Sequence, residues 1–383
     1  MIVKRMNITV AVLFLGMMAA AFILPNALFA QGEAAVPFLQ IAPNARADGM
    51  GEGGIGLADD ASAAHWKPAG LAFQRGQEVS LTHSNWLPQF QQADLFYDYI
   101  SYRQYVADWG GTISGSITYL NLGTFNITTT SPEVVGTFKG YEFAVTGGYS
   151  TQLSQSFGLG LNMRYIRSVL APIDVQGQGR EGIGSTASFD ISTLWKAREN
   201  LNIGFNLSNL GPKITYIDAA QADPIPTNLG LGFAYRAIES PYNSITFVLD
   251  FNRLLVRRYP GVTQKVTDTT TGKSTEVVIT NPSVDNLPKS IITAWGDRAL
   301  QKVTISGGVE YWYGAPKLIA LRFGYFYEAP NAGNRKFMTF GAGIRYDVYG
   351  FDFSYLSAIE ENSPLAETLR FTLLIAWGGP LAQ

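Results

Sequence analysis

Few side chains in this chain could do catalytic or metal chemistry. There are two histidines, His65 and His83, and no cysteine. Zinc sites draw on several His, Cys or carboxylate ligands, so this composition excludes a multi-histidine site and any thiol ligand. No combination of serine, histidine and acidic residue stands out as a nucleophilic set. We therefore expect no enzyme, no metal and no cofactor, and we interpret the histidines as ordinary polar residues of an N-terminal plug and of the first strand.

The segment Gly49-Met50-Gly51-Glu52-Gly53-Gly54 has the glycine spacing of a dinucleotide-binding fingerprint. That fingerprint works where it follows a strand and opens the helix of a βαβ unit, which places the pyrophosphate at a helix N-terminus. Here no strand precedes the segment and no such unit follows it. We interpret the glycines as backbone that packs closely within a plug.

The remaining chemistry lies in charged residues at alternate positions of extended segments. Successive side chains of a strand turn to opposite faces, and these residues lie opposite apolar neighbours. They are Arg164, Asp190, Asp250, Glu310, Arg322, Glu328, Arg345 and Arg370. If they face the interior of a barrel, both signs on neighbouring strands allow cross-strand ion pairs. Such pairs would hold register in a narrow lumen or line a water path in a wide one, and the lack of a single-sign ring favours the structural role.

The elements that position these charges are two-faced strands. Between Leu369 and Trp377 every second residue is apolar, whereas Arg370 and Thr372 lie on the opposite face. The same pattern recurs from about Glu78 onward, and many apolar faces end in Tyr or Trp. Aromatic residues at the ends of apolar faces are typical of the girdles of a membrane barrel. The sequence therefore predicts an all-β fold, a 14-stranded antiparallel transmembrane β-barrel with an N-terminal hatch or plug segment.

The expected strands alternate between short and long connections. We place them near residues 78–86, 94–104, 110–121, 139–150, 157–168, 184–196, 200–209, 228–237, 243–255, 302–313, 317–327, 336–346, 349–357 and 367–378. Connections after odd-numbered strands tend to be longer, at 122–138, 169–183, 210–227, 256–301 and 358–366. Outer-membrane barrels have short periplasmic turns and longer outside loops, so this asymmetry predicts that both termini are periplasmic.

The connection at 256–301 is much longer than the others. We expect a small hairpin around Thr271-Gly272 and a short helix between Pro288 and Leu300. A connection of this length is usually functional or disordered, yet loops also accept insertions readily. Its role, partner contact or decoration, stays open.

The N-terminus has the features of an export signal. Lys4 and Arg5 precede an apolar run from Ile8 to Leu24, and the small residue Ala30 precedes Gln31. We predict a signal peptide at 1–30, with an N-terminal transmembrane anchor as the alternative. The remaining chain divides into a hatch segment at 31–76, a barrel at 77–378 with its long extracellular loop at 256–301, and a C-terminal tail at 379–383.

The composition fits a barrel in the bacterial outer membrane. The chain has 383 residues with 40 glycines, 13% aromatic and 15% charged residues, whereas a helical membrane protein would carry several long apolar runs. An exported protein without cysteine has no disulfides, which suits a sheet whose hydrogen-bond ladder closes on itself. Without Lys4 and Arg5 the chain has 26 basic and 30 acidic residues, so nothing suggests nucleic-acid binding. A soluble all-β protein is an alternative, but its aromatic faces would need to be exposed or stacked.

Several stretches resemble the PorV/PorQ family of the type IX secretion system. They are residues 35–39, 43–51, 65–72, 208–214, 252–256, 324–328, 333–336 and 368–373, and they extend over essentially the whole mature chain. That family is related to the long-chain fatty-acid transporter fold, a fourteen-stranded barrel with an N-terminal hatch. Asp60, Ala61, Trp66, Pro68, Ala69 and Gly70 are similar to the hatch of this wider superfamily. Lys67 departs from it, because the superfamily usually has Asn at that position.

The resemblance implies a function in protein secretion. Such a barrel binds the C-terminal signal domain of secreted cargo at a large outer-membrane translocon barrel and passes it to a surface attachment complex, surrounded by membrane lipids. The loops 210–227 and 256–301 are candidate partner contacts, and the individual partner-binding residues are unknown. The alternative is a transporter of hydrophobic small molecules that uses the hatch and a lateral opening. Its apolar pocket would involve Pro37, Phe38, Leu39 and Ile41.

Overall fold

The computed structural model describes residues 34–90, 94–128, 133–171, 181–218, 221–259, 262–267, 274–280, 283–296, 299–330 and 332–378. The expected signal peptide at 1–30 and the expected tail at 379–383 lie outside these residues. Within the described ranges, no helix combines the length and the apolar character needed to cross a membrane.

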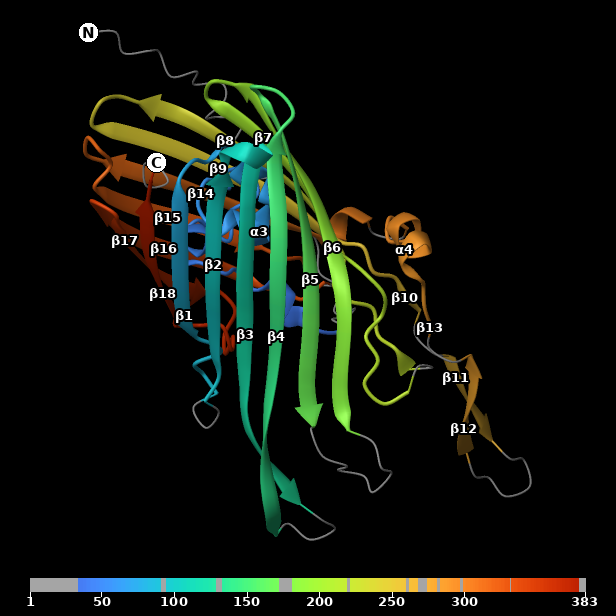
Figure 1. Ribbon diagram of the computed structural model, residues 1–383. Helices are drawn as coiled ribbons and strands as arrows, with labels where there is room; N and C mark the ends of the chain where they lie inside the picture. The colour runs from blue at the N-terminus through green and yellow to red at the C-terminus, as the bar shows by residue number, and fades with distance from the viewer. Residues whose placement is uncertain are drawn as a thin grey trace.

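Fourteen antiparallel strands close into one barrel, as the alternation predicts. In chain order they are β1 (Gln77–Asn85), β2 (Phe96–Val106), β3 (Gly111–Thr128), β4 (Val134–Gln152), β5 (Phe157–Ala171), β6 (Gly182–Arg198), β7 (Leu201–Leu210), β8 (Asn228–Glu239), β9 (Asn243–Leu254), β14 (Val303–Tyr313), β15 (Ile319–Tyr327), β16 (Lys336–Tyr346), β17 (Tyr349–Ala358) and β18 (Thr368–Trp377). Each strand pairs with its neighbour, and β1 pairs with β18 to complete the ring (Figure 1). The predicted fold class is confirmed.

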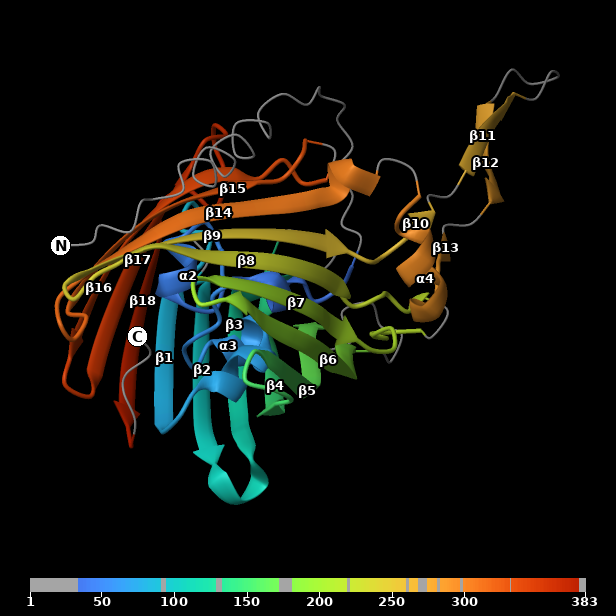
Figure 2. The ribbon, with the colours of Figure 1, turned by 90° about the horizontal axis from the view of Figure 1, so that it is seen from above.

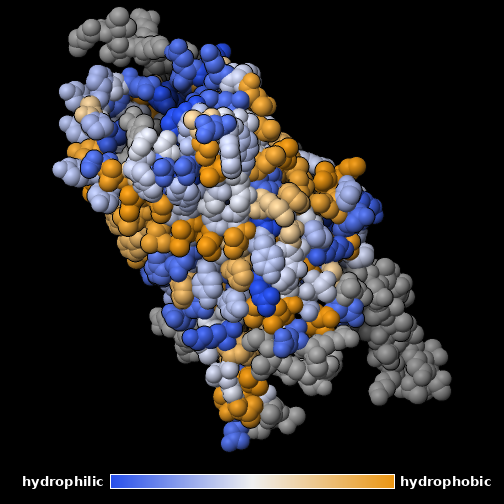
Figure 3. Space-filling model, viewed as in Figure 1, coloured by the Kyte–Doolittle hydropathy of each residue, from blue (hydrophilic) through white to orange (hydrophobic). Residues whose placement is uncertain are grey.

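The two faces of the wall differ as the sequence pattern predicts. On β18, Arg370 and Thr372 are buried inside the barrel, whereas Phe371, Leu373 and Trp377 are exposed on its outside. Orange hydrophobic residues gather on the outer surface in Figure 3. An apolar outer face and a polar inner face are the arrangement expected of a barrel in a lipid bilayer.

The two ends of the barrel differ in their connections. At the short-turn end, only a few residues join β4 to β5, β6 to β7, β8 to β9 and β16 to β17. A 3-10 helix, η3 (Ala107–Trp109), makes the turn between β2 and β3 at the same end. The opposite end, which we call the long-loop end, carries the connection between β9 and β14 and those between β7 and β8 and between β17 and β18. The predicted asymmetry is confirmed in most connections.

One predicted loop is wrong. Most of 122–138 is strand, because β3 and β4 continue as a paired hairpin past the ends of their neighbours (Figure 1). The pairing shifts between Asn121 and Thr124, where Gly123 has a φ of 81°. A bulge adds one residue to one strand and reverses the alternation beyond it, so a search for one continuous alternation ends there. Residues at the start of the predicted loop 169–183 are also strand, since β5 extends to Ala171.

The connection between β9 and β14 holds small elements of its own. These are β10 (Arg258–Tyr259), β11 (Val262–Thr267), β12 (Ser274–Thr280), β13 (Ser283–Val284), α4 (Leu287–Thr293) and η5 (Ala299–Lys302). Strands β11 and β12 pair with each other, which confirms the predicted hairpin, although its turn at Thr271-Gly272 lies outside the described residues. The predicted helix is α4, and it begins one residue earlier, at Leu287.

The N-terminal segment lies inside the ring of strands (Figure 2). It contains η1 (Pro37–Gln40), α2 (Ala45–Asp48), α3 (Ala63–Trp66) and η2 (Pro68–Phe73). We call described residues 34–76 the hatch. Its first residues join an apolar cluster near the long-loop end that includes Phe38, Leu39, Tyr97, Tyr99 and Leu120. The hatch thereby fills the middle of the barrel and places polar backbone against the inner faces of the strands.

Candidate functional site

Inward-facing glycines let the hatch backbone approach the wall closely. A methyl group added at Gly324 of β15 would come within 2.0 Å of the Gly51 nitrogen, and one at Gly160 of β5 within 2.2 Å of the Ala69 nitrogen. Any side chain larger than hydrogen at these two positions would therefore collide with hatch backbone. The small residues that alternate with apolar ones along the strands thus have a packing reason.

Asp250 binds the glycine-rich turn of the hatch. This buried residue of β9 accepts hydrogen bonds from the backbone N–H groups of Gly54, Ile55 and Gly56, at 2.7, 2.6 and 3.2 Å. Three N–H donors satisfy a buried carboxylate that would otherwise be costly to desolvate. Gly54 ends the segment that matched a dinucleotide fingerprint, and Gly51 of the same segment donates its N–H to Thr339 of β16 at 2.8 Å, so this segment contacts the barrel wall through its backbone.

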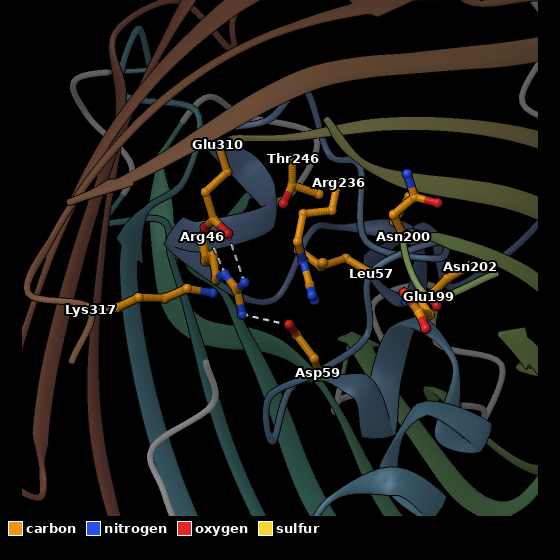
Figure 4. A pocket seen from close by; sticks show the side chains of 11 residues that line it. Arg46, Leu57, Asp59, Glu199, Asn200, Asn202, Arg236, Thr246, Glu310 and Lys317 are labelled. Carbon is orange, nitrogen blue, oxygen red and sulfur yellow. Dashed lines mark hydrogen bonds and ion pairs between the residues drawn. The ribbon is translucent and has the colours of Figure 1, made fainter. Parts of the chain in front are cut away.

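Arg46 of α2 starts a chain of buried ion pairs that continues along the wall. It donates to Glu310 of β14 through Nε and Nη2, both at 2.8 Å, and to Asp59 at 2.7 Å (Figure 4). Glu310 also accepts from Arg322 of β15 at 2.8 Å. Arg322 and Arg345 then both donate to Asp352 of β17, the shortest contacts being 2.8 and 2.7 Å. The mixed charges predicted for the lumen are brought together, and the hatch supplies one of the cations.

Two further carboxylates tie the hatch to the seam between β1 and β18. Asp48 of α2 forms an ion pair with Arg370 of β18 and accepts a hydrogen bond from Ser354 of β17 at 2.5 Å. Glu78 of β1 accepts from the Ala61 N–H at 2.8 Å and from Arg103 of β2 at 2.9 Å. Both carboxylates are completely buried. Removing their partners would leave a buried charge uncompensated and would destabilise the protein.

Of the other predicted hatch residues, some contact the wall and some contact other parts of the hatch. Trp66 O accepts from Asn206 of β7 at 2.9 Å, Pro68 O accepts from Ser150 of β4 at 2.6 Å, and Ala69 N–H donates to Ser192 of β6 at 2.9 Å. Asp60 forms an ion pair with Arg46 at 3.2 Å within the hatch. Gly70 packs on Ala58, whose carbonyl oxygen leaves no space for a Cβ.

Lys67 differs from the other hatch residues. Its side chain is 0% exposed, and its Nζ has no hydrogen-bond partner among the described residues. Burial lowers the pKa of Lys67 to about 7, although nearby Asp250 and Asp59 act in the opposite direction. An ammonium group at this position is therefore poorly stabilised.

The structure places the remaining predicted residues in different kinds of contact. Arg164 of β5 and Asp190 of β6 form a cross-strand pair at 2.9 Å, as expected. Glu328 follows β15 and pairs with Arg335 of the same connection at 2.7 Å. His65 lies in the hatch, where burial lowers its pKa to about 3, and His83 lies on β1, 2.7 Å from Asp98. Whether any of these residues acts in function stays a prediction.

Sequence reasoning missed several members of the network. They are Arg46, Asp48, Glu78, Arg103 and Asp352. Asp352 has the same signal as the residues that were found, because it lies between Phe351 and Phe353 on an alternating strand. Arg46 and Asp48 lie in an aperiodic segment, where no pattern of residue types indicates the direction of a side chain. In the described part of the chain, no group of three His, Asp or Glu side chains could hold a metal ion.

The hatch separates two cavities of different size. A polar cavity of about 30 Å³, enough for roughly one water molecule, lies beside Arg46 near the short-turn end, with Lys317 and Arg236 in its lining (Figure 4). A larger cavity of about 1030 Å³ lies on the other side of the hatch and is bordered by residues of the long loops. We call this larger space the vestibule. Its lining combines apolar residues such as Phe38, Trp86 and Leu120 with Asn206 and Asn252.

Comparisons with known proteins identify a family and several barrels to which the chain is similar. A family model described as "Type IX secretion system protein PorV" matches residues 30–261. The toluene transporter TbuX of Ralstonia pickettii is 11% identical, with a TM-score of 0.49 over 87% of this chain and 97% of that one. The toluene transporter TodX of Pseudomonas putida is 12% identical, with a TM-score of 0.49 and coverage of 91% and 98%. A FadL homologue of Pseudomonas aeruginosa is 12% identical, with a TM-score of 0.48 and coverage of 88% and 98%. Among curated proteins, none matches the chain significantly.

We predict that Arg370→Leu strongly destabilises the barrel. The change would leave Asp48 buried without its cationic partner, and removing one member of a buried pair costs about 3–5 kcal/mol. Arg236→Leu is the control, because its pair with Glu239 is exposed and such pairs contribute roughly 0–1 kcal/mol. Urea unfolding in lipid vesicles, followed by heat-modifiability on gels, measures both. Equal stability of the two variants would contradict the assigned direction of Arg370.

We predict that Lys67→Met stabilises the protein below neutral pH. With a folded-state pKa of about 7 and an unfolded value near 10.4, the unfolded chain binds the proton more tightly between these values. Wild-type stability should therefore rise as pH increases from about 7 to 10, and the Met variant should lack this rise. Thermal melts at about pH 6 and pH 10 test this, with roughly 2–4 °C expected per kcal/mol gained. A Met variant that is less stable at pH 6 would refute the interpretation.

Proposed function

Because the chain belongs to the PorV family of type IX secretion system proteins, we propose that it binds the C-terminal signal domain of secreted cargo at a large translocon barrel. In this proposal it then passes the cargo to a surface attachment complex. The chain is a non-enzymatic outer-membrane barrel of this family. A cargo domain could contact this barrel either in its lumen or at one of its two ends.

The hatch is the observation that carries the proposal. Its backbone and side chains are bonded to strands around the ring, through Asp250 on β9, Glu310 on β14, Ser192 on β6 and Glu78 on β1. Displacing it would expose several buried charges at once, which is energetically costly. A folded cargo domain is also far larger than either cavity. These facts support contact at the long-loop end rather than passage through the lumen.

We propose that the long-loop end faces the cell exterior and that both termini are periplasmic. Short turns on the periplasmic side and long loops outside are the rule for outer-membrane barrels, and β1 begins and β18 ends at the short-turn end. In the same proposal, residues 1–30 are removed on export, 31–76 form the hatch and 77–378 form the barrel. The predicted hatch residues would then keep the lumen closed while the loops bind partners.

The extended β3–β4 hairpin is the surface that we propose for cargo contact, together with the loops 210–227 and 256–301. Phe125 and Phe138 stack on one face of it, with ring centroids 5.2 Å apart. Phe125, Val134 and Val135 are 43%, 53% and 61% exposed, and hydrophobic residues are visible near its tip in Figure 3. Apolar residues that extend beyond a membrane wall into water are typical of protein contact sites.

A second candidate function is transport of hydrophobic small molecules. The observation that favours it is the apolar part of the vestibule lining, which includes Phe38, Leu39 and Ile41 of the hatch together with Trp86 and Leu120. A pocket of this kind could hold an acyl chain or an aromatic molecule. Purification in mild detergent separates the two functions. A transporter would retain small hydrophobic molecules but no cargo or partner barrel.

We predict that Phe125→Ser with Phe138→Ser reduces the recovery of cargo with this protein by about five- to tenfold. The two rings supply apolar contact area, and roughly 1.4 kcal/mol corresponds to a factor of ten in affinity. Asn126→Ser with Thr137→Ser is the matched control, because these two residues are paired on the opposite face of the same hairpin. Co-purification in mild detergent, with cargo quantified by mass spectrometry, gives the result. Unchanged cargo recovery in the Phe variant would exclude the hairpin as the contact.

A further inference from the structure

Glu52 is an unusual residue on the vestibule side of the hatch. It lies between Gly51 and Gly53, lines the vestibule and has a φ of 63°. Residues other than glycine seldom adopt this left-handed conformation, and they keep it where the surroundings or the function require it. Glycine, which is present on both sides, would adopt this conformation at a lower energetic cost than glutamate. The position of a carboxylate here therefore needs an explanation.

The neighbouring charges of the vestibule already have partners. Arg370 is paired with Asp48, Arg335 with Glu328, and Arg164 with Asp190. Glu52, in contrast, makes no hydrogen bond or ion pair with any residue that the structure describes. A half-buried carboxylate without a donor is unfavourable, and a ligand that brings a donor would relieve this cost.

The rest of the vestibule shows what else such a ligand would contain. Asn206 has a buried side-chain oxygen that accepts no hydrogen bond within the described chain. Asn228 and Asn252, which also line the space, are bonded to each other at 2.9 Å. The lining also includes the apolar residues Pro37 of the hatch and Trp86, which are at least partly exposed. The lining thus offers the Glu52 carboxylate, amide groups and apolar contact in one space.

We propose that the vestibule binds an extended polypeptide segment that carries a Lys or Arg side chain, with the Glu52 carboxylate as counter-ion of that side chain. The vestibule volume of about 1030 Å³ is at the upper end of ligand pockets and far exceeds the needs of one small cation. Amides satisfy peptide backbone, and the apolar residues receive neighbouring side chains of the segment. That the segment belongs to a secreted protein rests on the proposed function. The chemical nature of the segment is inferred from the vestibule alone.

The electrostatics of Glu52 give this site a pH dependence. Burial raises the pKa of Glu52 to about 7. Arg335, which follows β15, and Arg370 of β18 oppose the increase, whereas Asp48 of α2 and Glu328 add to it. The empty site is therefore largely protonated below neutral pH and ionised above it. A cationic ligand should bind more tightly as pH rises through 7.

The test uses two peptides of about eight residues, acetylated and amidated, with alternating Val and Thr. One has a central Lys and its twin has norleucine there. The full chain in lipid nanodiscs is titrated with each fluorescent peptide at about pH 6 and pH 8.5. We expect the Lys peptide to bind about tenfold or more tightly than its twin at pH 8.5, because hydrogen bonds to charged groups have this magnitude. The preference should shrink at pH 6.

Variants assign the effect to one carboxylate. Glu52→Gln should abolish both the Lys preference and its pH dependence, while Glu52→Asp should keep part of the preference. Glu361→Gln is the matched control, because Glu361 lines the same vestibule but is exposed, and it should bind like the wild type. Heat-modifiability confirms that each variant is folded.

Several results would overturn the proposal. They are absence of binding by both peptides, equal binding of the twin, an unchanged preference in Glu52→Gln, or butylammonium binding as tightly as the Lys peptide. Cargo recovery from cells is measured separately on the wild type. Normal cargo recovery without peptide binding would reject this site and leave the proposed function standing. Glu52-dependent peptide binding without any cargo would reject the function and keep the site.

Discussion

The bonding of the hatch to the inner wall is the interaction on which the rest of the structure depends. A barrel of fourteen strands encloses a space that its own inward side chains do not fill, and its inner face is polar. Arg46, Asp48 and Asp250 resolve both problems, because each contributes to a buried contact between hatch and strand. Asp48 and Asp250 have these partners only when hatch and wall are together, whereas Arg46 also pairs with Asp59 and Asp60 of the hatch. The hatch is therefore part of the fold and not a loose insert.

A fixed hatch determines where function can take place. It leaves a cavity with room for about one water molecule near the short-turn end and a vestibule of about 1030 Å³ bordered by the long loops. Membership of the PorV family connects the chain to protein secretion, and a folded protein fits neither cavity. Contact with partners then falls to the loops, the projecting β3–β4 hairpin and the open side of the vestibule. Glu52 gives this last surface a charge that the protein itself leaves unpaired.

Much of the barrel follows from its sequence, because the physics of a strand repeats every two residues. The strand number and the inward direction of Arg370 follow from that period, but it does not specify which charges pair, such as Arg164 with Asp190. The hairpin beyond Asn121 did not follow, since one bulge reverses the alternation. The directions of Arg46 and Asp48 could not be predicted either, because short aperiodic helices give no rule for which wall residue a side chain meets. Glu52 was visible only as part of a glycine-rich stretch, and its conformation emerged from the fold.

Amide hydrogen exchange of the hatch tests the central claim most directly. In the intact barrel, the N–H groups of Gly54, Ile55 and Gly56 bind Asp250 and should exchange as slowly as the strand amides. In Asp250→Leu, whose side chain has no hydrogen-bond acceptor, these amides should exchange much faster while the strands remain protected. The account would be contradicted if the wild-type hatch amides exchanged as fast as exposed loops, because the hatch would then not be held by the wall.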